Sequence, residues 1–170
     1  MPSMNAMSSD HPRPTPSAGR SLAALAGWLL LTFSASATSV FIADNGWYAG
    51  LAKPAWNPPG WVFGPVWTVL YAMMAVAAWR AWRKGGWAKQ KAALSLFVVQ
   101  WALNGLWTPL FFGLHRPGWA LAEILVLLAA ILTTLRAFWR VDRTAGLLFL
   151  PYAAWGAFAT VLNWTIWRLN

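Results

Sequence analysis

The chain has 170 residues, of which 59% are hydrophobic and only 10% charged, and its mean hydropathy is +0.48. A soluble domain carries about 25% charged residues, and one of this length cannot bury so much apolar surface in its own core. The net charge of +9 would suggest nucleic-acid binding in a soluble protein. Here the basic residues lie between apolar runs, as the charges that flank membrane spans do. The composition therefore predicts an integral membrane protein in a lipid bilayer, with no nucleic-acid partner, and the absence of cysteine excludes disulfides and thiolate metal sites.

The first 20 residues are rich in proline and serine and are predicted to form a disordered tail ahead of a membrane domain over residues 21–170. An alternative interpretation is a signal peptide, because Arg20 and the apolar run after it lead to the cleavage-like triplet at residues 35–37. The apolar run continues through Ile42, which favours a membrane span. Cleavage would leave only four spans.

Five apolar stretches are long enough to cross a bilayer, which takes about 20 residues in a helix. They cover about residues 22–42, 63–82, 92–112, 119–139 and 145–167. The connections after the second span are short, so successive helices should pack antiparallel. The predicted fold is an all-α integral membrane protein with a five-transmembrane-helix bundle and a Trp/Pro-rich loop between the first two helices.

Basic residues predict the orientation of the bundle. With five spans, the N-terminal tail and the second and fourth connections share one side, which carries ten Lys and Arg residues against three on the other side. The ten are Arg13, Arg20, Arg80, Arg83, Lys84, Lys89, Lys91, Arg136, Arg140 and Arg143, and the three are Lys53, Arg116 and Arg168. Because basic residues favour the cytoplasmic side, we expect a cytoplasmic N-terminus and a first loop outside, in the periplasm of a bacterial host.

The connection between the first two spans is the most distinctive segment, with four tryptophans and four prolines in the 21 residues 47–67. Proline lacks an N–H and clashes with the preceding turn, so a continuous helix is excluded here. A rigid aromatic connection between apolar segments is predicted to close over something as a lid loop. Its principal members are Trp47, Pro54, Trp56, Asn57, Pro58, Pro59 and Trp61.

Polar and aromatic residues recur at helical spacing on one face of three spans. They are Phe63, Trp67, Tyr71 and Met74 in the second span, Gln100, Asn104, Trp107, Thr108 and Phe111 in the third, and Tyr152, Trp155, Ala159 and Asn163 in the fifth. Carboxamides in hydrocarbon need partners, so these faces should point into the bundle. Two interpretations stay open: the polar groups bond neighbouring helices, or they line a cavity together with the small residues 34–39 of the first span.

Catalytic and metal-binding patterns are weak in this sequence. Glu123 is the only acid well inside a span, and we expect it at the interface or paired across helices rather than in a proton relay. No pair of carboxylates suggests acid–base chemistry, and His11 and His115 belong to no metal cluster. The sequence therefore predicts no metal site and no firm catalytic residue.

Several aromatic motifs, taken together, resemble the TspO/MBR family of tryptophan-rich sensory proteins, which are related to the mitochondrial translocator protein. The resemblance covers roughly residues 22–170 and rests on the following segments: Trp47-Tyr48, Lys53-Pro54-x-Trp56-Asn57-Pro58-Pro59, Trp61-x-Phe63 through Trp67, Trp101-x-x-Asn104-x-x-Trp107-x-x-x-Phe111-Phe112, Pro151-Tyr152-x-x-Trp155 and Asn163-x-x-x-Trp167-Arg168. Animal members carry a sterol motif with a tyrosine in the last helix, and this chain has Trp164 at that position.

The resemblance implies a five-helix homodimer whose first loop covers a pocket for tetrapyrroles such as protoporphyrin IX and haem. Sterols and isoquinoline or benzodiazepine drugs are further ligands of the family, and no cofactor is required. By position, the pocket residues are Tyr48, Phe63, Trp67, Asn104, Trp107, Phe112, Trp155 and Ala159. The leading interpretation is a receptor; the alternatives are a light- and oxygen-dependent porphyrin-degrading enzyme, with Trp67 and Trp155 as reactive residues, and a passive or partner-dependent transporter.

Overall fold

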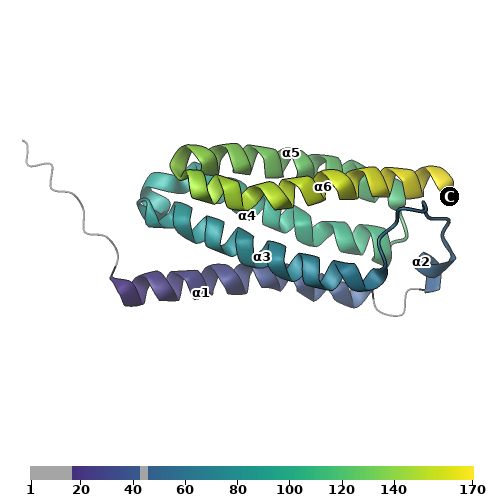
Figure 1. Cartoon of the computed structure of the whole chain (residues 1–170), viewed down its shortest axis with the longest axis horizontal. Coiled ribbons are helices and arrows are strands. Elements are labelled where there is room, and N and C mark those ends of the chain that lie inside the picture. The colour runs from purple at the N-terminus through teal and green to yellow at the C-terminus, as the bar shows by residue number, and fades with distance from the viewer. Residues whose placement is uncertain (1–16, 43–45) are drawn as a thin grey trace, which may run out of the picture.

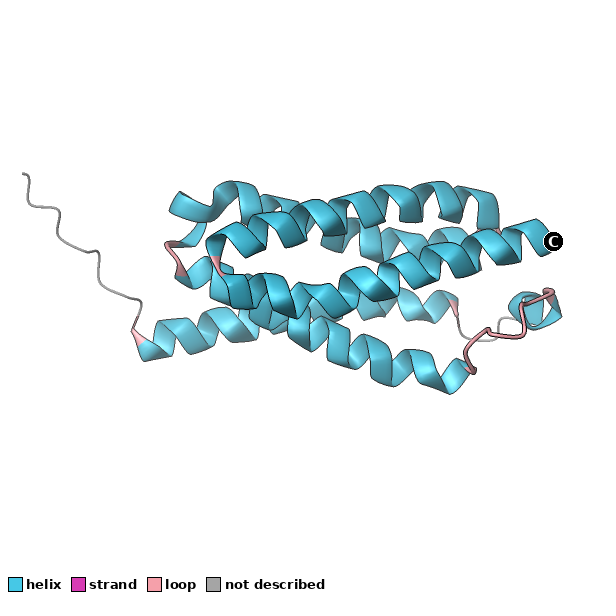
Figure 2. Cartoon of the chain, turned by 45° about the horizontal axis from the view of Figure 1, so that its top comes forward, coloured by secondary structure: helices cyan, strands magenta, loops and turns pink. Residues whose placement is uncertain are grey.

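The structure is a computed structural model that describes residues 17–42 and 46–170, and every regular element in these ranges is helical (Figure 2). The elements are α1 (Ala18–Ser34), η1 (Ala35–Phe41), α2 (Gly46–Gly50), α3 (Gly60–Arg83), α4 (Gly86–Thr108), η2 (Pro109–Gly113), α5 (Pro117–Val141) and α6 (Arg143–Leu169). Residues 1–16, most of the predicted tail, lie outside the described ranges. Ala18 already begins α1, so the helix starts before the predicted end of the tail at residue 20.

The five predicted spans are confirmed as helices long and apolar enough to cross a membrane within the described ranges. They run over Ala18–Phe41, Gly60–Arg83, Gly86–Gly113, Pro117–Val141 and Arg143–Leu169. Nine of their ten ends extend beyond the sequence-based bounds, because flanking residues such as Arg83 and Arg143 continue the helices into the headgroup region. The exception is the first span, which ends at Phe41, one residue short of its predicted bound.

The bundle is antiparallel. α5 packs against α4 and α6, and α3 packs against α1 and α6, so α1 lies along one side of the molecule (Figure 1). The short helix α2 and the connection to α3 lie at the same end of the bundle as the C-terminus (Figure 1). The segment that the sequence predicts as a lid loop therefore lies at this end.

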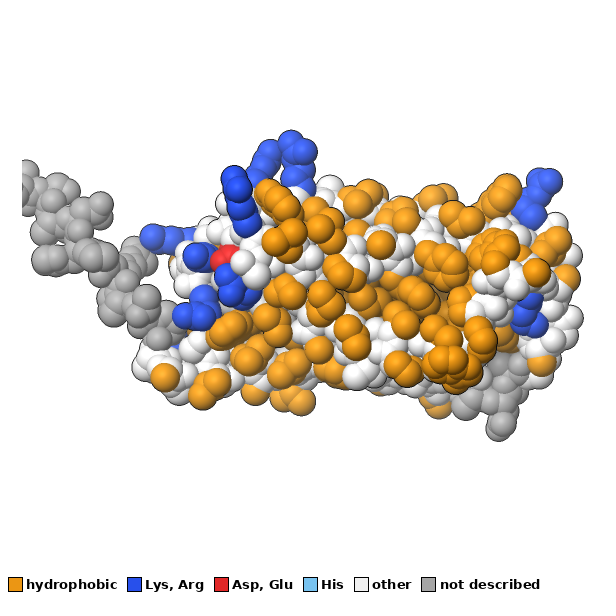
Figure 3. All heavy atoms as spheres, in the orientation of Figure 1, with side chains coloured by type: hydrophobic (Ala, Val, Ile, Leu, Met, Phe, Trp, Pro, Cys, Tyr) orange, Lys and Arg blue, Asp and Glu red, His pale blue; other side chains and the backbone are white. Residues whose placement is uncertain are grey.

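The face of the molecule drawn in Figure 3 is apolar along the middle of the bundle and basic at its ends. Hydrophobic side chains cover the middle, while Lys and Arg gather mainly at the end where α3 turns into α4 and α5 into α6 (Figure 3). Large apolar side chains of the membrane spans, such as Leu30 and Val40, are exposed on the surface. An apolar band of this extent matches a lipid environment rather than water.

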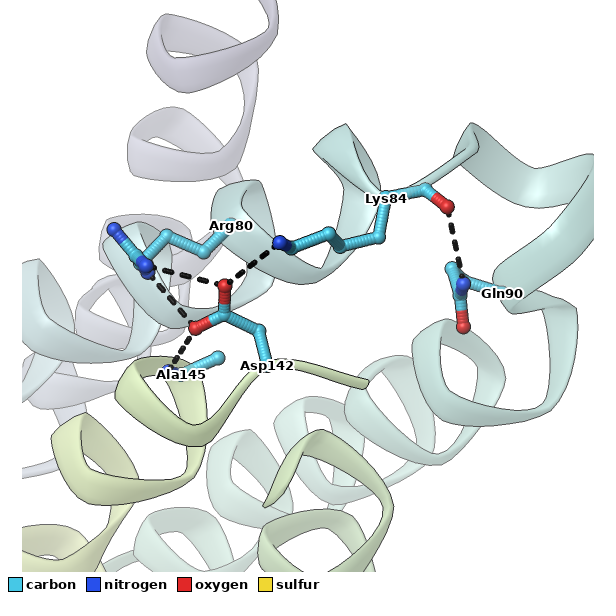
Figure 4. A network of polar contacts seen from close by, with 5 residues as sticks. All are labelled: Arg80, Lys84, Gln90, Asp142 and Ala145. Carbon is cyan, nitrogen blue, oxygen red and sulfur yellow. Dashed lines mark hydrogen bonds and ion pairs between the residues drawn. The ribbon is translucent and has the colours of Figure 1, made fainter. Parts of the chain in front are cut away.

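Asp142 ties the turn between α5 and α6 to the end of α3 (Figure 4). Its carboxylate accepts hydrogen bonds from Nε and Nη2 of Arg80, each at 3.1 Å, and from the backbone N–H of Ala145 at 2.9 Å, with Lys84 Nζ at 3.6 Å. Burial raises the pKa of this carboxyl, but the bonds from Arg80 and Ala145 and the charges of Arg80 and Lys84 outweigh burial and lower it below its ordinary value. The charged form caps α6 and fixes three helix ends.

The first span changes its helix type halfway. The hydroxyls of Ser34, Ser36 and Thr38 donate to carbonyls three residues earlier, at 2.6, 2.6 and 2.8 Å, where the chain tightens into the 3₁₀ helix η1. α1 packs along α3, whereas η1 packs against α4 and η2. The sequence predicted a single span here, and hydropathy alone carries no sign of this change.

Candidate functional site

A cavity of about 580 Å³ lies in the half of the bundle next to α2. Its wall takes residues from all five spans and from the loop between η1 and α3. Sites for small molecules are concave, mostly apolar and of about 300–1,000 Å³, and this cavity fits that description.

The eight residues predicted as ligand contacts all lie in the wall of this cavity. They are Tyr48, Phe63, Trp67, Asn104, Trp107, Phe112, Trp155 and Ala159. They come from α2, α3, α4, η2 and α6, so only the folded bundle brings them together.

The predicted lid loop contributes unequally to the wall. Asn57 and Pro58 line the cavity, whereas the other predicted members do not, namely Trp47, Pro54, Trp56, Pro59 and Trp61. Trp47 stacks on His115 with ring centroids 4.4 Å apart, and Trp56 meets Phe158 edge-on at 5.9 Å. Trp61 is 76% exposed, so it packs little against the loop. These tryptophans lie around the cavity rather than in it.

A polar network forms the deep end of the cavity. Tyr71 donates its hydroxyl proton to Asn104 Oδ1 at 3.2 Å, and Asn104 Nδ2 donates to the Tyr152 hydroxyl at 3.1 Å. All three residues are buried and all three line the cavity. Asn104 therefore fulfils both open interpretations, because it joins α4 to α3 and α6 and also faces the cavity.

A second hydrogen-bonded pair lies closer to the lid loop. Trp107 Nε1 donates to Asn163 Oδ1 at 3.0 Å, and Asn163 Nδ2 donates to the Pro117 carbonyl at 2.9 Å.

The end of α4 widens into the π-helical turn η2, because Pro109 has no N–H. In this turn the Leu114 N–H donates to the Pro109 carbonyl at 2.8 Å. This turn stacks Phe111 on Trp107 at 5.0 Å.

Aromatic rings from α3 and α6 form one side of the cavity. Trp67 stacks on Tyr71 at 5.1 Å and meets Tyr152 edge-on at 6.2 Å, and Phe63 meets Trp155 at 5.8 Å. Tyr71 and Tyr152 were not predicted as contacts, although their spacing from Trp67 and Trp155 indicated a shared face.

A further part of the cavity wall is aliphatic and comes from α5. Ile124, Leu127 and Ile131 line it. The sequence predicted none of them, because α5 is aliphatic on several faces and its periodicity singles out no residue for a cavity.

The lid loop is held over the cavity by Tyr48. Its ring meets Phe112 at 5.3 Å, its hydroxyl donates to Asn57 Oδ1 at 3.3 Å, and the Lys53 ammonium lies 4.7 Å from its ring centroid. Burial raises the pKa of the Tyr48 phenol, and the hydrogen bond to Asn57 offsets this only in part, so the hydroxyl stays protonated at neutral pH. The Asn170 side chain also pairs with the backbone N–H and carbonyl of Ala52, both at 3.0 Å.

Two expectations about individual residues are wrong, those for Gln100 and Glu123. Gln100 is fully buried outside the wall, and its amide has no partner among the described residues. Met74 is buried in the core, which agrees with a face that turns into the bundle. Glu123 is 9% exposed, and neither of its carboxylate oxygens has a partner in the described part of the chain, so it is not paired across helices. The described residues contain no group of three metal-ligating side chains.

Comparison with known proteins gives this arrangement a family. Residues 21–168 match the TspO/MBR family. The human translocator protein is 44% identical over 136 residues, which cover 78% of this chain and 80% of that protein. The protein CrtK of Rhodobacter capsulatus is 38% identical over 154 residues (88% and 94%), and the tryptophan-rich sensory protein of Cereibacter sphaeroides is 42% identical over 147 residues (84% and 91%). The chain, an integral multi-pass membrane protein, therefore belongs to the TspO/MBR family.

Proposed function

We propose that this protein is a membrane receptor or regulator that binds a planar tetrapyrrole, such as protoporphyrin IX or haem, in the cavity between its helices. The observation that carries the proposal is a cavity of about 580 Å³ with aromatic walls and one polar network at its deep end. The tetrapyrrole is the ligand, and no cofactor is required.

The chemistry of the wall supports such a ligand. Aromatic faces and edges from Trp67, Trp107 and Trp155 suit a flat π-system, which gains from stacked and edge-on contacts. Asn104 uses one of its two amide protons on Tyr152, so the second one suits an acceptor atom of the ligand. Sterols and isoquinoline or benzodiazepine compounds are second candidates for the same cavity. Sterols rank behind tetrapyrroles because Trp164 of the sterol motif is exposed on α6 and lies outside the cavity wall.

A titration of protoporphyrin IX into the detergent-solubilised protein tests the proposal. We expect saturable quenching of tryptophan fluorescence. Ala159→Phe fills the cavity and should weaken binding at least about tenfold, a change of about 1.4 kcal/mol. Ala157→Phe, two residues away on the exposed face of α6, is the matched control and should bind as the wild type does. Absence of saturable quenching in the wild type would contradict the proposal.

A second candidate function is light- and oxygen-dependent degradation of the bound porphyrin. Two oxidisable indoles, Trp67 and Trp155, lie in the cavity wall, and this observation favours it. Illumination of the complex should bleach the porphyrin absorption faster than illumination of free porphyrin in detergent. If Trp67→Phe binds normally but stops the bleaching, the protein is an enzyme; if free porphyrin bleaches equally fast, it is not.

A third candidate, passive or partner-dependent transport, is favoured by the name translocator protein of the human relative. Tetrapyrrole flux into proteoliposomes under a gradient, compared with empty liposomes, tests it. A flux equal to that of empty liposomes would leave the receptor as the better description.

We also propose a cytoplasmic N-terminus, a lid loop outside, and a homodimer in the membrane. The gathering of Lys and Arg at the end opposite α2 supports the orientation (Figure 3). Because the chain has no cysteine, single-cysteine variants report the orientation of the bundle directly. A membrane-impermeant maleimide added to intact cells should label Ala52→Cys but not Lys89→Cys, and the reverse pattern would overturn the orientation. The family resemblance supports the dimer, and the mass of the particle in lipid nanodiscs measures it.

A further inference from the structure

One stretch of the cavity wall is made of small residues that are also exposed at the surface of the bundle. Ser36 and Ser39 of η1 and Gly64 and Thr68 of α3 all line the cavity, and all four are exposed. Facing the cavity does not by itself expose a residue, since Asn104 lines the same cavity and is buried. These four residues therefore border an opening between the cavity and the outside of the bundle.

The opening arises where the first span leaves α3. The rings of Phe33 and Tyr71 still meet at 5.6 Å, near the end of α1. Beyond this contact the chain tightens into η1, which packs against α4 and η2. No other element of the described chain takes the place of the first span beside this part of α3, since a Cβ added to Gly60 or Gly64 would meet no atom within 4 Å.

The surroundings of the opening are apolar. Val40 beside Ser39 is 67% exposed, and Val69 beside Thr68 is 56% exposed, both within the membrane spans. The hydroxyls of Ser36 and Thr68 already donate to the carbonyls of Phe33 and Gly64, at 2.6 and 2.9 Å. The protons of these two hydroxyls are therefore already used, and a hydrocarbon-soluble molecule that passes them leaves neither hydrogen bond unmade.

At the end of the bundle the cavity is bordered by the lid loop, from which Asn57 and Pro58 line its wall. The lid loop is fastened by the bond from Tyr48 to Asn57 and by the two bonds between Ala52 and Asn170. A ligand arriving from water would pass a loop that these contacts hold in place, whereas a ligand dissolved in the lipid meets small side chains and open space at Gly64.

We propose that the opening between η1 and α3, bordered by Ser36, Ser39, Gly64 and Thr68, is the route by which a flat apolar ligand passes sideways between the bilayer and the cavity. The proposal rests on the function proposed above, in that it requires a ligand in this cavity. It adds that the ligand is drawn from the lipid phase, and that the lid loop need not open for exchange.

The test is the kinetics of protoporphyrin IX binding to protein in lipid nanodiscs, followed by stopped-flow quenching of tryptophan fluorescence. Gly64→Leu should narrow the opening and slow association and dissociation alike, each by about tenfold or more, with an unchanged Kd. A blocked route lowers both rates equally, whereas a damaged site changes their ratio. Gly27→Leu, at an equally open position of α1 outside the cavity wall, is the matched control and should keep the wild-type rates.

Ser39→Leu narrows the opening from the opposite rim and decides the matter if Gly64→Leu does not fold. Wild-type rates in both bulky variants, or a weaker Kd with an unchanged association rate, would overturn the lateral route while leaving the binding function in place. Absence of saturable binding in the wild type would remove the proposed function and the route together.

Discussion

The side-chain amide of Asn104 donates a hydrogen bond to the hydroxyl of Tyr152 at 3.1 Å and thereby joins α4 to α6 at the deep end of the cavity. Its carbonyl oxygen accepts from Tyr71 of α3 at 3.2 Å, so one amide links three helices. All three residues are buried, and each partner would lose its hydrogen bond without the other. The same group that stabilises the bundle therefore also sets the polar end of the cavity.

Removal of the Tyr152 hydroxyl should destabilise the protein. Tyr152→Phe leaves an Asn104 N–H without its partner in a buried site, which costs about 1–3 kcal/mol. Unfolding in mixed micelles with increasing SDS measures the change. The double variant Asn104→Leu/Tyr152→Phe should lose less stability than the sum of the two single variants, because it removes both hydrogen-bond partners together and leaves neither unsatisfied. Strict additivity would contradict a shared network.

Loss of the Asp142 charge should destabilise the end of the bundle opposite α2. Asp142→Asn removes the ion pair with Arg80, and we expect the free energy of unfolding at pH 7 to fall by about 1–3 kcal/mol. The pKa of Asp142 is lower in the folded state than its ordinary value of 3.8, so its stabilising contribution is complete above that value and is lost as the pH falls through the folded pKa.

Thermal unfolding in detergent at pH 7 and at pH 3 checks this dependence. The difference between the wild type and Asp142→Asn should be largest at pH 7 and should shrink on acidification. Arg116→Gln, at the other end of the bundle, is the control and should match the wild type at pH 7. A gap that widens on acidification would show that the charge of Asp142 does not stabilise the fold.

The lid loop should loosen when Asn170 loses its side chain. Asn170→Ala removes both hydrogen bonds to Ala52, and hydrogen exchange of the backbone over residues 51–57 should become faster. Leu169→Ala, a neighbouring exposed position, should leave this exchange unchanged. The variant also separates the two routes into the cavity: if the ligand passes between η1 and α3, its binding rates stay at the wild-type values even though the loop has loosened.

A methyl group at Gly146 should disrupt the contact between α5 and α6. An added Cβ would lie 2.7 Å from Trp139 Cε3 and 2.9 Å from the Trp139 Cα, so the two helices would have to separate. We expect Gly146→Ala to lose about 1–3 kcal/mol of stability in the SDS titration. Gly105→Ala in α4, where the added Cβ meets nothing within 4 Å, should instead gain up to about 1 kcal/mol from helix propensity. Equal effects at both glycines would contradict close packing at Gly146.

An apolar side chain in place of Glu123 should stabilise the bundle. Both oxygens of this buried carboxyl are without a partner in the described residues, so Glu123→Met removes an uncompensated polar group and should raise the free energy of unfolding by about 1–3 kcal/mol. Glu123→Gln keeps a buried polar group and should bring little gain. If Glu123→Met folds but binds protoporphyrin IX more weakly, the carboxyl serves the ligand and this account of it is wrong.

The cavity wall was predictable to the extent that its residues repeat at helical spacing. Asn104 and Trp107 share a face of one apolar span, and Trp155 and Ala159 share a face of another. Such a face must turn away from lipid, since an amide or indole N–H in hydrocarbon needs a partner. The partner itself was not predictable: Asn104 bonds Tyr71 and Tyr152, which lie 33 residues before it and 48 residues after it.

Burial inside the bundle was predicted less well. Gln100 shares a helix face with Asn104 and was expected either to bond a neighbouring helix or to line a cavity. It does neither among the described residues, because helix packing closes over Gln100 one turn away from Asn104. Glu123 was expected at the interface or paired across helices because charge in lipid is costly, and the fold buries it without a partner among the described residues. Spacing along one helix places a side chain on a face, but the depth of the cavity depends on how neighbouring helices diverge.

By itself, the sequence determined the five spans and the Trp/Pro-rich connection, because hydropathy over about 20 residues and the missing N–H of proline are local properties. It also indicated which faces turn inward. Only the tertiary structure decided that the first span leaves α3 at Ala35, that the deep end of the cavity is a three-helix hydrogen-bond network, and that Gly64 borders an opening. These features depend on distances between helices, which arise from the packing of side chains far apart in the chain.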